Sequence, residues 1–492
     1  MKANSYLRFI TRRAQLVDWA VIFLTVAVGC VLVTLSYPLP NTGSDSFGYL
    51  DAAIKDKFSA YRPFGYSAYL QFLRFFSHSI YTVIVSHALI YALSAGLMLL
   101  AVKKYWPPRH HAVFIVFTVL AVFSPVAVFM LDTIYSDILF CSLIFIMLAM
   151  AMVFLMEESW VALAIYAVAL FCSMHTRYSA MFFPLVFIPV FALKGKRAMR
   201  IASVGLTVAA FLVFYAGMCA NMKDTYGKRQ FSTGFDGWQL ANNALHILPH
   251  LDKAELKARS SDEDVNALQD FCISYMDFIR EQSRDGKSAT AEFMWNNHSP
   301  LKQVLYYNLN KAGGTYYDTW IRLGSGVFRD YGKWLILKYP GKFIRYYLLP
   351  NMREMFFPVY YEMVCIYHDV DPGKKEIVEW FDATPDKGLY ARNDNFGRVT
   401  RPLLPWIELI TWIVLLVAVV SVFVRKGRLS RDTVVILVLI FLFGFIYYGT
   451  TTFASPIAMR YWVPMHAVKL CFAWIAFKDY RFPSQKRLTS VQ

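Results

Sequence analysis

The chain has 492 residues, of which 57% are hydrophobic and 17% charged, and its formal net charge is +16. A typical soluble domain has roughly 45–50% apolar and about 25% charged residues, so this composition argues against a water-soluble chain and for one solvated by lipid. Much of the basic excess lies in short loops between apolar runs, where it sets orientation in a membrane, so we expect no nucleic-acid partner.

Apolar runs recur in the N-terminal and C-terminal parts of the chain. The first, 17–37, follows Lys2, Arg8, Arg12 and Arg13 without a small-residue cleavage site, which predicts a retained signal anchor. Runs of about 20 residues can cross a hydrocarbon core of about 30 Å. Further spans are expected at 79–102, 112–131, 138–156, 160–174, 180–193, 201–220, 402–424, 433–450 and 461–477. We therefore predict an all-α integral membrane protein with about ten transmembrane helices.

The basic short loops indicate the orientation of these spans. With a cytoplasmic N-terminus, the basic loops at 103–109, 194–200, 425–431 and 478–487 all fall inside. Because Lys and Arg are enriched in cytoplasmic loops, we expect the chain to lie in a cell inner membrane with both termini on the cytoplasmic side. The loop 38–78, the turns 132–137, 175–179 and 451–460, and the long polar segment 221–401 then face outward. Function is expected on that face.

The pattern divides the chain into three parts. We expect an N-terminal transmembrane module at 1–220 with a catalytic first outer loop, an extracytoplasmic domain at 221–401, and a C-terminal transmembrane module at 402–492. Between 251 and 285, charges surround spaced apolar residues such as Leu256, Val265 and Leu268, which predicts amphipathic helices. Cys272 and Cys365 share this domain, but their spacing defines no disulfide framework.

The first outer loop contains the run NTGSDSFGYLDAA at 41–53, a turn followed by an expected short helix. Asp45 lies at the start of that helix, so it is either the helix cap or a catalytic carboxylate. The loop continues through Lys55 and Lys57 to the run YRPFGYSAYL at 61–70, which begins with Tyr61 and Arg62. This mixture of cations and aromatic rings is typical of a membrane surface.

Several short pieces together resemble the GT-C superfamily of polytopic glycosyltransferases, in particular the protein mannosyltransferase and lipid A aminoarabinose transferase type. The first loop resembles theirs in having an acid before Tyr-Leu-x-Ala and then a basic residue with Pro and Gly-Tyr. The run DTIYSDILF at 132–140 is similar to the second acidic motif of the family, and HTRYSA at 175–180 to its arginine at the top of the sixth span. RYWVP at 460–464 resembles the opening of a late span. Taken singly, each acid could cap a helix and each arginine could anchor an interface.

The resemblance implies a GT-C-like membrane core and a membrane glycosyltransferase. Such an enzyme takes a sugar from a polyprenyl-phosphate donor and transfers it, with inversion, to an envelope glycan, lipid or protein acceptor. The acceptor hydroxyl loses a proton as it attacks, a role for a carboxylate base that we assign to Asp45. Asp137 would hold the acceptor or a metal, with Asp132 and Asp51 as alternatives.

The leaving lipid phosphate is a stable anion that needs cations rather than a proton donor. The predicted substrate-binding residues are Arg62, Arg177 and Arg460, together with Lys55, Lys57, Tyr61, Asp132 and Tyr461. The sequence assigns no cofactor. A divalent cation would need oxygen ligands from Asp45 and Asp137, since the paired acids common in the family's first loop are here a lone Asp45 between serines.

Two stretches of the extracytoplasmic domain are also notable. Trp238 stands beside amides in the run 237–244, which suits either sugar stacking or an ordinary helix. The run 338–347 mixes basic and aromatic residues and is expected to lie along the membrane surface, so membrane lipids are expected partners.

Two other functions compete with glycosyl transfer by this chain. An O-antigen polymerase or ligase would also use polyprenyl-linked sugars, but with key arginines in large outer loops. A transporter or flippase of such lipids would place ionisable residues within the spans. The middle regions of the expected spans are almost free of acids and cations, which favours chemistry at a surface.

Overall fold

The computed structural model describes residues 5–38, 40–58, 61–283, 291–356, 375–381, 395–424 and 429–478. Within these ranges the regular structure is helical, and the one extended pairing is an isolated parallel bridge between Asn41 and Thr133. The predicted all-α class is therefore confirmed. Cys365 and the basic residues at 425–428 and 479–487 lie outside the described residues.

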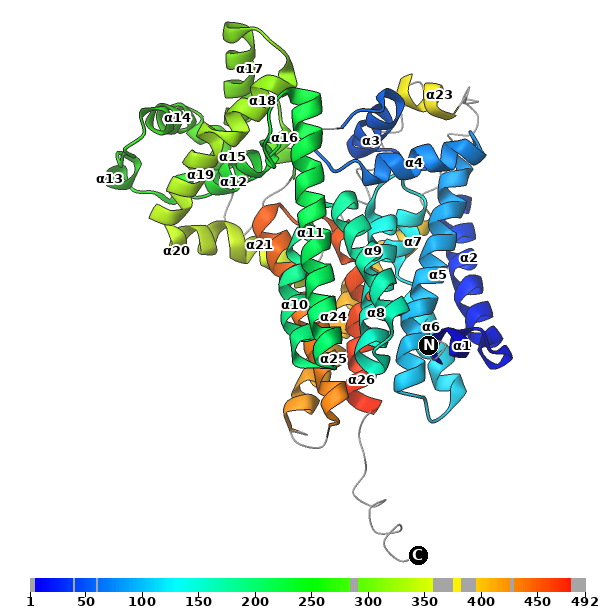
Figure 1. Cartoon of the computed structure of the whole chain (residues 1–492). Helices are drawn as coiled ribbons and strands as arrows, with labels where there is room; N and C mark the ends of the chain where they lie inside the picture. Colours follow the sequence, from blue (N-terminus) through cyan, green and yellow to red (C-terminus); the bar gives the residue numbers. More distant parts are fainter. Residues whose placement is uncertain are drawn as a thin grey trace, which may run out of the picture.

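A bundle of long helices forms the larger part of the molecule (Figure 1). Its elements are α1 (Ser5–Ile10), η1 (Arg13–Gln15), α2 (Leu16–Ser36), α5 (Tyr81–Tyr105), α6 (His111–Val122), α7 (Pro125–Leu131), α8 (Asp137–Glu157), α9 (Trp160–Thr176), η2 (Tyr178–Phe182), α10 (Pro184–Leu193), α11 (Arg197–Tyr226), α24 (Asn395–Val424), α25 (Arg431–Ala454), η6 (Met459–Trp462) and α26 (Val463–Lys478). A helix lies at each of the predicted spans. Among the described residues, six helices are long and apolar enough to cross a membrane, so this is a helical membrane protein.

The number of spans differs in detail from the sequence-based expectation. The expected span 112–131 is broken, because α6 and α7 meet at 57°. Pro125 starts α7 and disfavours a helical conformation of the preceding Ser124, which explains the break. Counting this bent pair gives up to seven spans among the described residues, while α9, α10 and α26, with 17, 10 and 16 residues, are shorter than the six long helices. The figure of about ten spans stays a prediction.

Helix α8 lies at the centre of the bundle. In its most apolar stretch 89% of residues are buried, and it packs against α5, α9 and α26. Because α8 is apolar on all sides, it is stable only when other helices surround it or lipid does. By contrast, only 17% of the corresponding stretch of α24 is buried. Helix α24 therefore presents most of its surface to lipid.

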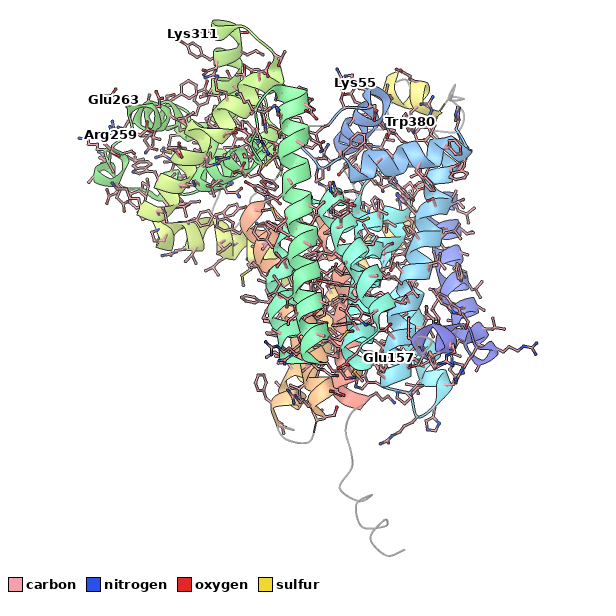
Figure 2. All side chains as sticks on the ribbon, viewed as in Figure 1. Lys55, Glu157, Arg259, Glu263, Lys311 and Trp380 are labelled. Atoms are coloured by element: carbon pink, nitrogen blue, oxygen red, sulfur yellow. The ribbon has the colours of Figure 1, made fainter. Side chains whose placement is uncertain are left out.

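Two short helices from the first loop, α3 (Ser44–Lys55) and α4 (Gly65–Phe76), lie over one end of the bundle, which we call the α3 end (Figure 1). A further helix, α23 (Lys375–Phe381), packs on α3. The centre of its Trp380 ring lies 4.5 Å from Cζ of Arg74 in α4. Figure 2 shows Lys55 and Trp380 at this end and Glu157 at the opposite end of the bundle.

A separate group of helices stands at the α3 end beside α11, and we call it the helical domain (Figure 1). It comprises α12 (Phe235–Leu245), η3 (Leu248–His250), α13 (Lys253–Leu256), α14 (Glu263–Ser274), α15 (Met276–Gln282), α16 (Ala291–Trp295), α17 (Pro300–Ala312), α18 (Tyr316–Ser325), α19 (Val327–Lys338), α20 (Pro340–Phe343), η4 (Ile344–Leu348) and α21 (Leu349–Phe356). Helices occupy the stretch 251–283, as the amphipathic pattern predicts. The run 338–347 forms the end of α19, α20 and part of η4, at the underside of this domain.

Glycines allow α12 to pack closely on its neighbours. A Cβ atom at Gly237 would lie 1.9 Å from the carbonyl oxygen of Gly324, and one at Gly332 would lie 2.8 Å from the backbone nitrogen of Ala241. This packing buries Trp238 completely. The amide of neighbouring Asn243 donates to the carbonyls of Phe453 and Ala454 at the end of α25. Trp238 is therefore part of the core of the domain, and Asn243 joins the domain to the bundle.

A charged pair is buried in the middle of two described helices, where the sequence indicates almost no charge. Oε2 of Glu408 in α24 lies 2.5 Å from Nζ of Lys469 in α26, and both side chains are almost fully buried. His466 Nδ1 lies 3.8 Å from the other carboxylate oxygen. Opposite charges can be buried together because each compensates much of the cost of desolvating the other. The pair joins the otherwise peripheral α24 to the bundle.

Candidate active site

Four segments that are far apart in the sequence bring charged residues together at the α3 end. Asp45 lies in the first turn of α3, and Asp137 is the first residue of α8. Arg177 directly follows α9, and Arg460 lies in the short turn η6 before α26. Residues at helix ends can meet in this way because neighbouring helices of a bundle begin and end at the same level.

Asp45 is held between two arginines. Its Oδ1 accepts a hydrogen bond from Nη2 of Arg62, and its Oδ2 lies 2.9 Å from Nη1 of Arg460. Burial raises the pKa of the carboxyl, but the nearby charges of Arg62, Arg460 and Arg177 lower it more, to about 2. Asp45 is therefore ionised at neutral pH and is a weak proton acceptor while both arginines face it.

A second ion pair lies beside the first. Nη1 of Arg177 donates to Oδ1 of Asp137 at 2.5 Å, and the Asp137 side chain is only 2% exposed. Neither aspartate acts as a helix cap. The cap of α3 is Gly43, whose N–H bonds to the Ser46 hydroxyl, and the cap position of α8 is Ser136. Both carboxylates are thus directed at guanidinium groups rather than at the backbone.

Aromatic rings support the three guanidinium groups. The Arg62 guanidinium lies 4.9 Å from the centre of the Tyr49 ring, and that of Arg177 lies 5.1 Å from the Tyr461 ring. Arg460 lies 5.0 Å from the ring of Tyr135 and 5.7 Å from that of Tyr461. Such contacts orient a guanidinium without neutralising it. The three arginines and two aspartates, which we call the Arg-Asp cluster, carry a net charge of +1 and suit an anion.

Hydrogen bonds join the first loop to the turn between α7 and α8. The Asn41 N–H donates to the Asp132 carbonyl at 2.6 Å, and the Asn41 carbonyl accepts from the N–H of Ile134 at 2.9 Å. The side chain of Asp132 is buried and accepts from Nδ2 of Asn41 at 3.2 Å. Ser46 donates to the carbonyl of Ile134 at 2.9 Å. Asp132 thus holds the loop that carries Asp45 in place.

The remaining predicted residues lie around the cluster. Lys55 is exposed and pairs with Asp51 one helical turn away, at 2.6 Å, and Lys57 is also exposed. The ring of Tyr61 packs against the helical domain, 4.8 Å from the Trp320 ring between ring centres. The structure therefore joins the three arginines, Asp45, Asp137 and Tyr461 in one group and leaves the two lysines exposed at and just after the end of α3.

Sequence reasoning missed two members of this group, Tyr49 and Tyr135. Tyr49 follows Asp45 by four residues, so a helix places both on one face, and this spacing was the available signal. Tyr135 contacts Arg460, which lies near the other end of the chain, and no local pattern indicates such a contact. A Cβ atom at Gly43 would lie 2.1 Å from the Tyr135 hydroxyl, so the glycine is needed for this approach.

A cation site from Asp45 and Asp137 does not fit this arrangement, because the carboxylates face guanidinium groups. In the described part of the chain, no three His, Cys, Asp or Glu side chains are grouped to hold a metal. Comparison of the chain with protein-family models, with curated proteins and with solved structures gives no match.

Proposed function

We propose that this protein is a GT-C-like membrane glycosyltransferase. It moves a sugar from a polyprenyl-phosphate donor to an envelope glycan, lipid or protein acceptor on the extracytoplasmic face of a bacterial inner membrane. The observation that carries the proposal is the Arg-Asp cluster, in which Asp45 and Asp137 are paired with three arginines at one end of a lipid-solvated bundle. In this proposal the α3 end is the extracytoplasmic end.

The three arginines would bind the phosphate of the donor. A guanidinium offers parallel N–H groups that match two phosphate oxygens, and it stays charged when partly buried. Arg62, Arg177 and Arg460 come from three different parts of the bundle end, so together they could surround one phosphate. The polyprenyl chain would extend from the phosphate into the lipid around the bundle.

Asp45 would act as the general base. An oxygen of the acceptor hydroxyl attacks the anomeric carbon and forms the new glycosidic bond as its proton passes to Asp45. The bond between the anomeric carbon and the phosphate oxygen breaks, and its electron pair stays on the phosphate. Attack from the side opposite the leaving phosphate inverts the anomeric carbon.

The ion pairs of Asp45 suggest how donor binding would prepare this base. With Arg62 and Arg460 facing it, Asp45 has a pKa of about 2 and holds a proton poorly. A donor phosphate competes for the same guanidinium groups and would weaken their attraction for the carboxylate. The pKa of Asp45 would then rise toward its ordinary value, which makes it a stronger base only once the donor is bound.

One observation favours a second candidate, a transporter or flippase of polyprenyl-linked sugars. The buried Glu408–Lys469 pair lies within the expected spans, where ionisable groups often mark a transport path. Its contacts join α24 to α26, which suits a structural role equally well.

An O-antigen polymerase or ligase would be recognised by a chain-length assay, because it extends or transfers a whole glycan rather than one sugar.

The test is transfer of a tritiated sugar from polyprenyl phosphate in membranes that contain wild type, Asp45→Asn or Asp51→Asn at equal expression. Asp51 is the matched control because it is on the same helix but pairs with Lys55 on the surface. We expect Asp45→Asn to lose about 100-fold or more in rate, as the loss of a general base does. Asp51→Asn should keep wild-type activity. Equal activity of all three proteins would remove Asp45 as the base. No transfer by wild type would mean either that the donor is wrong or that the chain is a transporter.

A further inference from the structure

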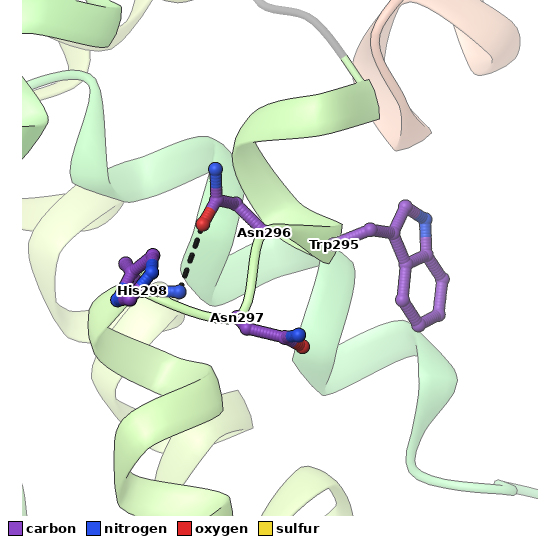
Figure 3. Close-up of a pocket in the computed structure, with 4 residues that line it drawn as sticks. All are labelled: Trp295, Asn296, Asn297 and His298. Carbon is purple, nitrogen blue, oxygen red and sulfur yellow. Dashed lines mark hydrogen bonds between the residues drawn. The ribbon is translucent and has the colours of Figure 1, made fainter.

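A hollow of about 400 Å³ lies in the helical domain and is lined by Trp295, Asn296, Asn297 and His298. These residues form the turn between α16 and α17, and Figure 3 shows the two asparagines between the indole and the imidazole. The hollow is largely open to the surroundings, so it would contact one face of a ligand rather than enclose it. None of the four described lining residues is an acid, a lysine or an arginine. Lys302, whose Nζ lies 5.3 Å from the centre of the Trp295 ring, is buried and donates to the Tyr316 hydroxyl. The lining therefore favours a neutral ligand.

Trp295 provides a rigid aromatic surface in this hollow. Its ring is stacked on Trp320, with ring centres 5.8 Å apart and planes only 2° apart, and 38% of the residue is exposed. Further contacts with Tyr61, Trp238 and Lys302 fix the ring, so binding a ligand on its exposed part costs little side-chain entropy. The negative face of an indole attracts the weakly positive C–H groups of a pyranose ring.

The neighbouring side chains provide hydrogen-bonding groups at fixed positions. Oδ1 of Asn296 accepts from the backbone N–H of His298 at 2.8 Å, and Oδ1 of Asn297 accepts from the Tyr306 hydroxyl at 3.0 Å. Within the described part of the chain, the amide nitrogens of both asparagines have no protein partner. Each can therefore donate to a hydroxyl oxygen of a ligand. The exposed imidazole of His298 adds a third polar group.

The hollow is connected to the Arg-Asp cluster through adjacent residues. The Tyr61 ring lies 5.7 Å from the Trp295 ring and 4.8 Å from that of Trp320, between ring centres. The next residue, Arg62, contacts Asp45. Side chains in contact thus link the hollow to the Arg-Asp cluster.

From these contacts we infer that the hollow is a sugar-binding subsite for the acceptor glycan, with Trp295 stacking on one pyranose and Asn296, Asn297 and His298 binding its hydroxyls. The acceptor role rests on the proposed function, whereas neutral-sugar binding does not. The aromatic ring that sequence analysis linked to stacking, Trp238, is buried behind this surface, 6.0 Å from the Trp295 ring. We therefore assign sugar stacking to Trp295 and not to Trp238.

The binding test uses the full chain in lipid nanodiscs with Asp45→Asn, which prevents turnover. The probes are maltotriose, mannotriose and triacetylchitotriose, observed by saturation-transfer NMR. We expect at least one of them to bind, about tenfold more weakly after Trp295→Ala. His298→Ala should weaken binding about threefold and serves as a second variant because its exposed side chain supports no packing. Tyr307→Ala, which removes another exposed ring of the same domain, should bind like the parent.

Unchanged binding after both Trp295→Ala and His298→Ala would overturn the inference, and so would a parent protein that binds none of the three sugars. A kinetic test in the active protein checks whether the bound sugar belongs to the acceptor. Trp295→Ala should raise KM for the acceptor and leave kcat unchanged. If wild type transfers no sugar but sugar binding still needs Trp295, the proposed function fails and the sugar site stands. If wild type transfers sugar but sugar binding does not need Trp295, the proposed function stands and the sugar-binding subsite is wrong.

Discussion

Oδ2 of Asp45 lies 2.9 Å from Nη1 of Arg460, although the two residues belong to the first loop and the last turn of the bundle. The same carboxylate also contacts Arg62. The first and last parts of the chain therefore build one site. Neither the N-terminal nor the C-terminal helices alone contain the Arg-Asp cluster.

Replacing Arg460 tests whether this contact serves the donor phosphate. We expect Arg460→Met to reduce sugar transfer by about 100-fold or more, because one positive group that stabilises the leaving phosphate is lost. Arg460→Lys should recover part of the rate, since it restores charge without the bidentate geometry. Transfer of tritiated sugar in membranes measures both variants.

The control for this prediction is Arg259→Met. Arg259 pairs with Asp270 on the surface of the helical domain, on the side of the molecule away from Lys55 of α3 (Figure 2). Its loss should leave transfer unchanged, because exposed ion pairs contribute little. If Arg460→Met transfers sugar as fast as Arg259→Met, the arginine does not act on the donor.

The pH dependence of transfer tests the proposed change at Asp45. In the free protein the pKa of Asp45 is lowered to about 2, so the stability from its ion pairs is present above about pH 4 and is lost as the pH falls toward 2. The profile of kcat/KM for the donor reports the free protein and should show no acid limb from Asp45 above about pH 4. The profile of kcat reports the donor-bound protein, and its acid limb should lie about one pH unit or more higher. Acid limbs at the same pH in both profiles would contradict donor-induced activation of the base.

The Glu408–Lys469 pair allows a test between the transferase and the transporter. We expect Glu408→Gln to lower the free energy of unfolding by about 3–5 kcal/mol, because Lys469 is left buried without its carboxylate. The double variant Glu408→Leu with Lys469→Met should be within about 1 kcal/mol of wild type, as an apolar pair can replace a buried ion pair. Thermal unfolding of the purified protein measures both.

Activity of the same double variant separates the two functions. A structural pair predicts sugar transfer at nearly the wild-type rate in the double variant. A transport path through Glu408 predicts that movement of a polyprenyl-linked sugar across vesicles is abolished although the protein is folded. Loss of sugar transfer in the stable double variant would show that the pair is more than a structural contact.

Gly43 should be sensitive to the smallest substitution. Gly43→Ala would place a methyl group where the Tyr135 hydroxyl lies, and displacement of Tyr135 would disturb Arg460. We expect a loss of about 1–3 kcal/mol in stability from overpacking and a drop in transfer of about tenfold or more. The control is Gly205→Ala in α11, where a Cβ atom would meet nothing within 4 Å. Wild-type transfer by Gly43→Ala would show that Tyr135 can move without affecting the site.

The sequence predicted the helical class and the places of the helices well, because apolar runs such as 138–156 are long, continuous and governed by local composition. It could not place the break at Pro125 between α6 and α7, since proline in membrane helices is often accommodated without a sharp bend. It also did not indicate that Glu408 and Lys469 form a buried ion pair within the spans. Each residue taken singly in an apolar run gives no sign of its partner on another helix.

The sequence by itself determined which residues have the chemistry of the candidate site: Asp137, Arg177 and Arg460 stand at the ends of apolar runs, and Asp45 and Arg62 stand in the first outer loop. Only the tertiary structure decided their pairing, with Asp45 between Arg62 and Arg460 and Asp137 on Arg177. It also decided that Trp238 is buried and Trp295 exposed. Hydropathy acts on each segment by itself, whereas ion pairs and aromatic packing depend on which helix ends meet, and that is set by the packing of the whole bundle.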